Sequence, residues 1–159
     1  MLDSHREQMR QYLVVAESLR LKPYWDCCSR SLRQSCAKDG GVHLGKLTIG
    51  IGRNIEDVGL TALESYHLLE NDVDRAIAQV VSRYPWIEEH NEARQAALVE
   101  LMFNMGPETL KQFVNTLAAF RMKDYPKAVE GLKKSKWYRQ VSSSRSGRII
   151  GMIESGEFA

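Results

Sequence analysis

The chain has 159 residues, of which 43% are hydrophobic and 26% charged, and its formal net charge is +2. This composition is ordinary for a soluble globular protein, either one compact domain or two small lobes. No apolar run reaches the length of a membrane span, and residues 1–10 are too charged for a secretory signal.

The first predicted element is a helix that ends close to Glu17. A capping box at residues 4–7 precedes apolar residues at helical spacing. Pro23 disfavours helical geometry in the residue before it, so the helix is expected to fade between residues 17 and 21. We expect Glu17 on the last turn, with one edge against apolar neighbours and the other facing a cleft. Such burial favours the protonated carboxyl that a general acid requires.

A second acid and an extended segment follow this helix. Asp26 lies nine positions after Glu17 and is expected in a short turn. Residues 47–52, LTIGIG, alternate as a strand does, and the glycines would let a backbone or a sugar approach closely. The hydroxyl of Thr48 in this strand both donates and accepts hydrogen bonds. Glycosidic hydrolysis needs an acid for the leaving oxygen and a carboxylate on the opposite side of the sugar, which Glu17 and Asp26 can supply.

Residues 27–44, CCSRSLRQSCAKDGGVHL, separate the second acid from the strand. A D-G-G turn signal near the end of this segment predicts an enlarged hairpin or flap. Cys27, Cys28, Cys36 and His43 could ligate zinc, but they lack the paired C-x-x-C spacing of structural zinc sites. Three cysteines fit a reducing compartment, so free thiols are the favoured interpretation. A disulfide from Cys27 or Cys28 to Cys36 remains open.

The remainder of the chain is predicted to be helical. A capping box at 61–64 opens a long helix whose apolar residues step by threes and fours to Val81. A loop is expected at Pro85, and Asn91 is expected to cap a helix that ends at Gly106. Further short helices are predicted at about 108–113, 115–122, 124–133, 136–140 and 143–154. The predicted fold class is therefore α+β and mostly helical.

The segment 131–153 is basic. It contains no acidic residue, and its basic residues are Lys133, Lys134, Lys136, Arg139, Arg145 and Arg148. Such a surface would attract a polyanion by long-range steering, although a solvated helical face is the simpler interpretation.

Several of these stretches together resemble one family. The pattern E-x-L-R-L-K-x-Y-x-D runs from Glu17 to Asp26, and T-I-G-I-G begins at Thr48. LMFNMG follows at 101–106, and KSKWYRQ at 134–140 is followed by two arginines. In this order the motifs closely resemble the phage-type lysozymes, the endolysins of glycoside hydrolase family 24. The resemblance covers nearly the whole chain except the segment 27–44, which is usually much shorter in the family.

The resemblance implies a two-lobed lysozyme-like fold in a single domain, 1–159. A small β-containing lobe would span 13–60 with the insertion at 27–44, a connecting helix 61–81, and a helical lobe 82–159. The implied activity is hydrolysis of the β-1,4 bond between N-acetylmuramic acid and N-acetylglucosamine in bacterial peptidoglycan, leading to host cell lysis. The resemblance implies no cofactor or metal, no nucleic acid, no stable membrane insertion and a monomer. It also implies holin-dependent release from the host cytoplasm to the cell wall.

The resemblance also implies roles for individual residues. Glu17 would be the general acid, while Asp26 with Thr48 would position the attacking water. Phe103 and Thr116 match residues that line the saccharide cleft. Arg145 matches an arginine that orients the first acid in the family. Two positions depart from the family pattern: Gly131 stands where relatives offer a polar side chain, and Arg53 stands where many relatives carry histidine, so a structural ion pair is expected to differ.

Two alternatives remain open beside hydrolysis. A lytic transglycosylase would act on the same substrate without water and with one acid, but Asp26 and Thr48 argue against it. A non-catalytic protein could instead disrupt walls or membranes through its cationic C-terminal helices. Inversion at the sugar, which the family is taken to show, would require room for a water between the two carboxyl groups.

Overall fold

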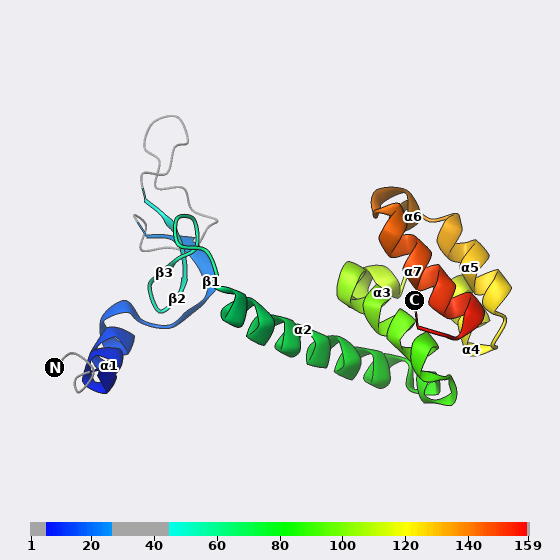
Figure 1. Ribbon diagram of the computed structural model, residues 1–159, viewed down its shortest axis with the longest axis horizontal. Helices are drawn as coiled ribbons and strands as arrows, with labels where there is room; N and C mark the ends of the chain where they lie inside the picture. The colour runs from blue at the N-terminus through cyan, green and yellow to red at the C-terminus, as the bar shows by residue number, and fades with distance from the viewer. Residues whose placement is uncertain (1–5, 27–44, 159) are drawn as a thin grey trace. The chain divides into compact units, whose positions relative to one another are not determined.

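The computed structural model describes residues 6–26 and 45–158. The chain divides into two compact units, residues 1–65 and 66–159, and each is considered by itself. Figure 1 identifies the helices and strands of both units. Among the described residues, no helix is both long enough and apolar enough to span a lipid bilayer.

The first unit contains one helix and a small antiparallel sheet. Helix α1 (Arg6–Glu17) is followed by strands β1 (Arg20–Trp25), β2 (Leu47–Gly50) and β3 (Arg53–Asn54). The strand order is β1-β2-β3, so β2 is central. Thr48 of β2 lies opposite Tyr24 of β1 and Asn54 of β3. Because paired residues project to the same face of a sheet, these three side chains share one face.

The helix end at Glu17 was predicted correctly, and the strand predicted over residues 47–52 is confirmed for residues 47–50. Asp26 lies in a turn as expected, but the six residues of β1 before it form a strand that was not predicted. Pro23 tolerates this placement because β1 is an edge strand, where a missing N–H breaks no central ladder. The pairing register also shifts between Arg20 and Tyr24, on either side of this proline.

The second unit is helical. Helix α2 (Ala62–Arg83) begins in the first unit and continues into this one. It is followed by η2 (Pro85–Glu89), α3 (Glu92–Leu110), α4 (Val114–Arg121), α5 (Tyr125–Lys133), α6 (Lys136–Gln140) and α7 (Ser143–Ser155). Helix α7 contacts α3 and α5, and α5 also contacts α4 and α6. The predicted helices at 124–133, 136–140 and 143–154 are confirmed within a residue or two, whereas a 3₁₀ helix replaces the loop expected at Pro85.

Local capping signals predicted several helix starts. The Thr61 hydroxyl accepts a hydrogen bond from the Glu64 N–H at 3.2 Å, and the Glu64 carboxylate accepts one from the Thr61 N–H at 2.8 Å. Asn91 and Ser142 accept bonds from backbone N–H groups at the starts of α3 and α7. Gly106 breaks α3 with a φ of 74°, so the regular helix stops where predicted and a last turn runs on to Leu110.

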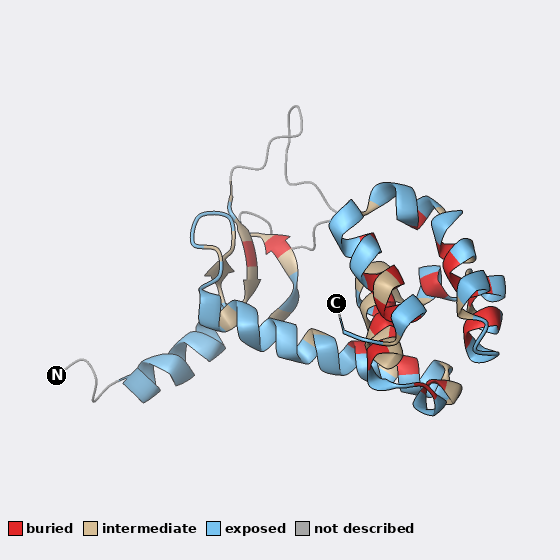
Figure 2. Ribbon diagram, turned by 45° about the vertical axis from the view of Figure 1, so that its right-hand side comes forward, coloured by how far each residue is buried: buried red, intermediate tan, exposed pale blue. Residues whose placement is uncertain are grey.

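The apolar core of the described residues lies in the second unit, as the red segments of Figure 2 show. Its largest fully buried side chains are Phe120, Leu98, Leu101, Met102, Leu110, Leu132, Ile149, Ile153 and Val80. By contrast, α1 has no buried residue, and in the described part of the first unit only Tyr24 and Thr48 are buried. The core therefore stabilises the second unit, and the first unit depends far more on polar contacts.

His90 is a polar residue within this apolar core. It is 5% exposed, and its ring packs against Trp86, Phe120 and Tyr125 with centroid distances of 5.6, 5.1 and 5.9 Å. Its Nδ1 lies 3.1 Å from the Tyr125 hydroxyl, while Nε2 has no hydrogen-bond partner among the described residues. Burial lowers the pKa of His90, so the neutral imidazole is favoured in the folded chain.

Candidate active site

Asp26 is held by the backbone at the start of β2. Its N–H donates to the Lys46 carbonyl oxygen at 3.0 Å, and the Lys46 N–H donates to Asp26 Oδ1 at 2.6 Å. A hydrogen bond to an ionised carboxylate is shorter and stronger than a neutral one. The described residues provide this carboxylate with no second hydrogen bond. One oxygen of Asp26 is therefore fixed, while the exposed side chain leaves the other accessible.

Thr48 shares the Lys46 carbonyl with Asp26. Its hydroxyl donates to that oxygen at 3.1 Å, and the residue is only 3% exposed. Lys46 and Thr48 are two residues apart in an extended segment, so they project to the same face. Because the hydroxyl proton is used in this bond, the Thr48 oxygen remains available as an acceptor. The structure thus brings the predicted pair Asp26 and Thr48 together around one carbonyl group.

The Lys46 ammonium makes a separate set of contacts. It lies 3.0 Å from Asp57 Oδ1 and 3.6 Å from Glu56 Oε1. The hydrogen bond between Lys46 and Asp57 raises the pKa of the lysine and lowers that of the aspartate. Asn54 also donates to Asp57, at 3.0 Å, and keeps the turn after β3 closed. The backbone of Lys46 therefore bonds Asp26, and its side chain contacts acidic residues of the 54–57 turn.

Glu17 lies against the glycine that ends the TIGIG motif. A Cβ atom built on Gly52 would lie 2.9 Å from Glu17 Oε2 and 3.0 Å from its Cδ. The carboxyl group therefore packs on the Gly52 backbone. The predicted burial of Glu17 against apolar neighbours was wrong, because α1 exposes all of its residues and Glu17 with them. The glycines were expected to let a backbone or a sugar approach closely; at Gly52 the group that approaches is the Glu17 carboxyl.

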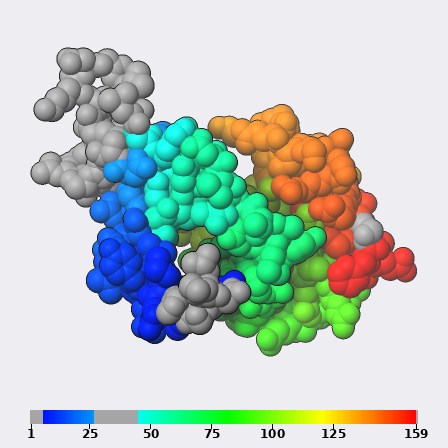
Figure 3. All heavy atoms as spheres, turned by 60° about the vertical axis from the view of Figure 1, so that its left-hand side comes forward, coloured from blue at the N-terminus to red at the C-terminus, as the bar shows by residue number. Residues whose placement is uncertain are grey.

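Residues 46–52 consequently contact all three predicted catalytic groups. The segment bonds Asp26 at its start through Lys46, contains Thr48, and meets Glu17 at its end through Gly52. In Figure 3 the segment belongs to the continuous cyan-to-green surface formed by β2, β3 and the following turns. A single strand and its turn therefore provide a common frame for the two acids.

Arg53 anchors this frame to the start of α2. Its Nε and Nη2 donate to the Gly59 carbonyl at 3.0 and 2.7 Å, and Nη2 also lies 2.9 Å from Glu64 Oε2. Hydrogen bonds from Thr61, reinforced by the charge of Arg53, lower the pKa of Glu64. Arg53, the position where a structural ion pair was expected to differ from the family, thus binds the capping box of α2. Among the described residues it makes no hydrogen bond or ion pair with Glu17 or Asp26.

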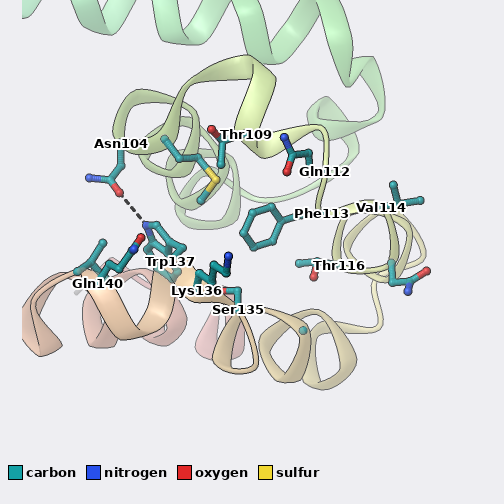
Figure 4. Close-up of a pocket in the computed structure, with 14 residues that line it drawn as sticks. Asn104, Thr109, Gln112, Phe113, Val114, Thr116, Ser135, Lys136, Trp137 and Gln140 are labelled. Atoms are coloured by element: carbon teal, nitrogen blue, oxygen red, sulfur yellow. Dashed lines mark hydrogen bonds between the residues drawn. The ribbon is translucent and has the colours of Figure 1, made fainter.

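Thr116 lines a pocket of about 730 Å³ in the second unit, shown in Figure 4. The pocket walls carry amide, hydroxyl and aromatic groups from Asn104, Gln112, Phe113, Asn115, Ser135, Trp137 and Gln140. The Trp137 Nε1–H donates to Asn104 Oδ1 at 2.7 Å. A Cβ atom at Gly131 would overlap the Thr116 hydroxyl oxygen. A side chain at 131 is therefore incompatible with the present position of Thr116.

Phe103 and Arg145 line a different pocket, of about 580 Å³, formed largely by aliphatic side chains of α2 and α3. Asn104 lines both pockets. The Phe103 ring is 46% exposed. Arg145 Nε lies 3.9 Å from Glu100 Oε1, and Arg148 makes a shorter contact to the same carboxylate. Within the second unit, Glu100 is thus the acidic partner of Arg145, and Phe103 and Thr116 lie in separate pockets.

The side chains considered as zinc ligands all belong to the segment 27–44. Cys27, Cys28, Cys36 and His43, together with the predicted hairpin, lie outside the described residues. Across 6–26 and 45–158, no group of three histidine, cysteine or acidic side chains could hold a metal ion.

A small antiparallel sheet in one unit and a helical second unit, with strand β2 beside two acids, define a lysozyme-like fold. The family model for phage lysozymes matches residues 16–151, a span that includes every predicted site residue. The chain belongs to the phage lysozyme family.

Individual relatives agree with this assignment. The chain is similar to the pre-baseplate central spike protein Gp5 of Enterobacteria phage T4, with 28% identity over 166 aligned positions, 97% of this chain and 29% of Gp5. It is also similar to probable T4-type lysozymes 1 and 2 of Dictyostelium discoideum, at 29% identity over 101 and 100 positions. Each of those matches covers 61% of this chain and 58% of the relative. The chain thus spans less than two thirds of the length of these relatives.

Proposed function

We propose that the chain is a muramidase, a glycoside hydrolase that cleaves the β-1,4 bond between N-acetylmuramic acid and N-acetylglucosamine in bacterial peptidoglycan. The observation that carries the proposal is that residues 46–52 contain Thr48 and contact both acids, Asp26 through Lys46 and Glu17 through Gly52. Membership of the phage lysozyme family supports the same reaction class.

Glu17 is the proposed general acid. Its exposed carboxyl can approach the glycosidic oxygen and donate a proton as the bond to the anomeric carbon breaks. Asp26 and Thr48 act on the attacking water. One Asp26 oxygen is occupied by the Lys46 N–H, so the other receives the water proton, while the Thr48 oxygen accepts the second water hydrogen. The water oxygen then bonds to the anomeric carbon, which gives inversion if the carboxyl groups are about 6.5–9.5 Å apart.

Phe103 and Thr116 are proposed to bind the substrate. Sugars and acetamido groups present many hydroxyl, amide and carbonyl groups, which match the amide and hydroxyl side chains around Thr116. The exposed ring of Phe103 offers an apolar face to a sugar. Arg145 is proposed to orient Glu17, as the family resemblance implies. Within the second unit its Nε lies 3.9 Å from Glu100 Oε1.

The biological setting proposed is that of an endolysin. The protein would be a monomer that reaches the wall from the host cytoplasm after holin-dependent release and lyses the cell. It would bind glycan strands without a cofactor, nucleic acid or stable membrane insertion. The match of 97% of the chain to a phage spike protein supports a second setting, in which the same chemistry serves a virion component.

The decisive experiment compares clearing of purified peptidoglycan by the wild type, Glu17→Gln and Asp26→Asn. Each variant should keep its fold and lose at least about 100-fold in rate, because proton transfer by a positioned acid or base contributes about 10²–10⁴-fold. Glu7→Gln is the matched control, since Glu7 is another exposed acid of α1 that contacts only Arg10 and Gln11 among the described residues.

The products separate the competing functions. Reducing ends support hydrolysis, whereas anhydro-muramic ends would identify a transglycosylase. Bacterial killing that survives Glu17→Gln would favour a non-catalytic cationic protein. Arg145→Ala should reduce the clearing rate less than either acid variant. Retention of most of the rate by Asp26→Asn would refute the role in positioning water.

A further inference from the structure

Gly50 and Gly52 have the same backbone conformation but different surroundings. Their φ angles are 70° and 68°, in the left-handed region that side chains other than glycine rarely adopt. A Cβ atom at Gly50 would meet no atom within 4 Å. A Cβ atom at Gly52 would meet Oε2, Cδ and Cγ of Glu17 at 2.9, 3.0 and 3.1 Å. The two positions thus carry the same backbone requirement, and only one of them touches the proposed acid.

The atoms that would collide belong to the end of a flexible side chain. Glu17 is exposed on the last turn of α1, so its carboxyl group can rotate away from an added methyl group. The structure around Gly52 would therefore remain folded, while the carboxyl group would move. A side chain at position 52 should therefore displace the Glu17 carboxyl group, with a smaller effect on the free energy of unfolding of the unit.

The backbone of Glu17 is fixed by the turn that ends its helix. Ser18 has a φ of 60°, and its N–H donates to the Val14 carbonyl at 3.2 Å. A left-handed residue after the last helical residue closes a helix and redirects the chain. The backbone of Glu17 is held by this turn, and its carboxyl group lies against Gly52.

We infer that Gly52 is a positioning residue for Glu17, an inference that rests on the proposed muramidase function. Its lack of a side chain lets the acid lie on the strand that also contains Thr48 and bonds Asp26 through Lys46. The separation of the two acids is thereby set within one continuous segment. In T-I-G-I-G, Gly52 leaves room for the Glu17 carboxyl group, whereas Gly50 is required only by its left-handed backbone conformation.

The test compares Gly52→Ala with Gly50→Ala in hydrolysis of purified peptidoglycan. Both variants should lose similar amounts in melting temperature, because both place alanine at a positive φ. Gly52→Ala should lower kcat at least tenfold with KM changed less than twofold, since substrate still binds but the acid is misplaced. Gly50→Ala should keep kcat within twofold. In a Glu17→Gln background, Gly52→Ala should cause no further loss.

Equal kcat losses in the two glycine variants, or a normal kcat for Gly52→Ala, would overturn the inference. So would a melting temperature for Gly52→Ala far below that of Gly50→Ala, because the acid would then not have moved aside. The proposed function has its own readout: an active Glu17→Gln refutes the function, whereas an inactive Glu17→Gln with an active Gly52→Ala refutes only the positioning role.

Discussion

The two units hold their side chains in place by different means. In the first unit the predicted catalytic groups are fixed by backbone hydrogen bonds and by one glycine, and α1 has no buried residue. In the second unit a contiguous apolar core surrounds Phe120 and Leu98, which are almost fully buried. The proposed catalytic acids and the apolar core thus lie in different units. Substitutions should therefore separate activity from stability.

The largest effect on stability is expected from the core of the second unit. Phe120→Ala removes a ring that is 1% exposed and should lower the free energy of unfolding by about 3–5 kcal/mol. Denaturant melts of the full chain measure this loss, with Val114→Ala, 67% exposed, as the control. The clearing rate per folded molecule should stay within about twofold. A parallel loss of intrinsic rate would contradict the separation of chemistry from stability.

A smaller loss of stability is expected in the pocket that Thr116 and Gly131 line. Gly131→Ala places a methyl group on the Thr116 hydroxyl and should cost about 1–3 kcal/mol in unfolding free energy through overpacking. Thr116→Ala removes the colliding oxygen, so the double variant should recover part of that loss. A double-mutant cycle measures the coupling. Strict additivity would show that the two positions do not share this space.

His90 makes stability depend on pH. Desolvation lowers its pKa, and the charges of Lys123 and Arg94 lower it further, against the opposing effect of Glu89. At pH values above 6.5, the ordinary value, folded and unfolded states both hold neutral imidazole. As the pH falls through 6.5 the unfolded state gains a proton first, so stability is lost, by up to about 1.4 kcal/mol per unit of pKa lowering. Melting temperatures of the wild type and His90→Leu at pH 7.5 and 5.5 should differ in slope, and equal slopes would remove His90 as the cause.

The smallest effect is expected at Lys46. Lys46→Met deletes the exposed contacts to Asp57 and Glu56 but keeps the backbone groups that bond Asp26 and Thr48. Exposed ion pairs contribute little, so the clearing rate should remain within about twofold of the wild type. Lys111→Met, which breaks an exposed pair with Glu108, is the matched control. A much larger loss for Lys46→Met alone would assign its side chain a role at the acid.

Local signals in the sequence predicted the elements that depend on neighbouring residues. The end of α1, the alternating β2 strand and the caps at Thr61, Asn91 and Ser142 follow from short-range chemistry. Strands β1 and β3 were missed because their extended form depends on pairing with β2, which is not visible in their own residues.

The site was predicted less completely than the helices. The motif predicted Glu17, Asp26 and Thr48 as site residues, but not that Asp26 and Thr48 both bond the backbone of Lys46. The glycines of T-I-G-I-G indicated a close approach, yet the approaching group emerges only from the tertiary structure. The burial of His90 and the collision between Gly131 and Thr116 likewise depend on residues distant in sequence.

The reciprocal bonds between Asp26 and Lys46 have a consequence for protein engineering. They join the end of β1 to the residue before β2. These two bonds need only Asp26 and Lys46, so they do not depend on how many residues separate the two positions. Lengthening a loop adds only about 0.6 kcal/mol for each doubling. A binding peptide or an affinity tag could therefore be inserted between positions 26 and 46 while the bonds that hold Asp26 are kept.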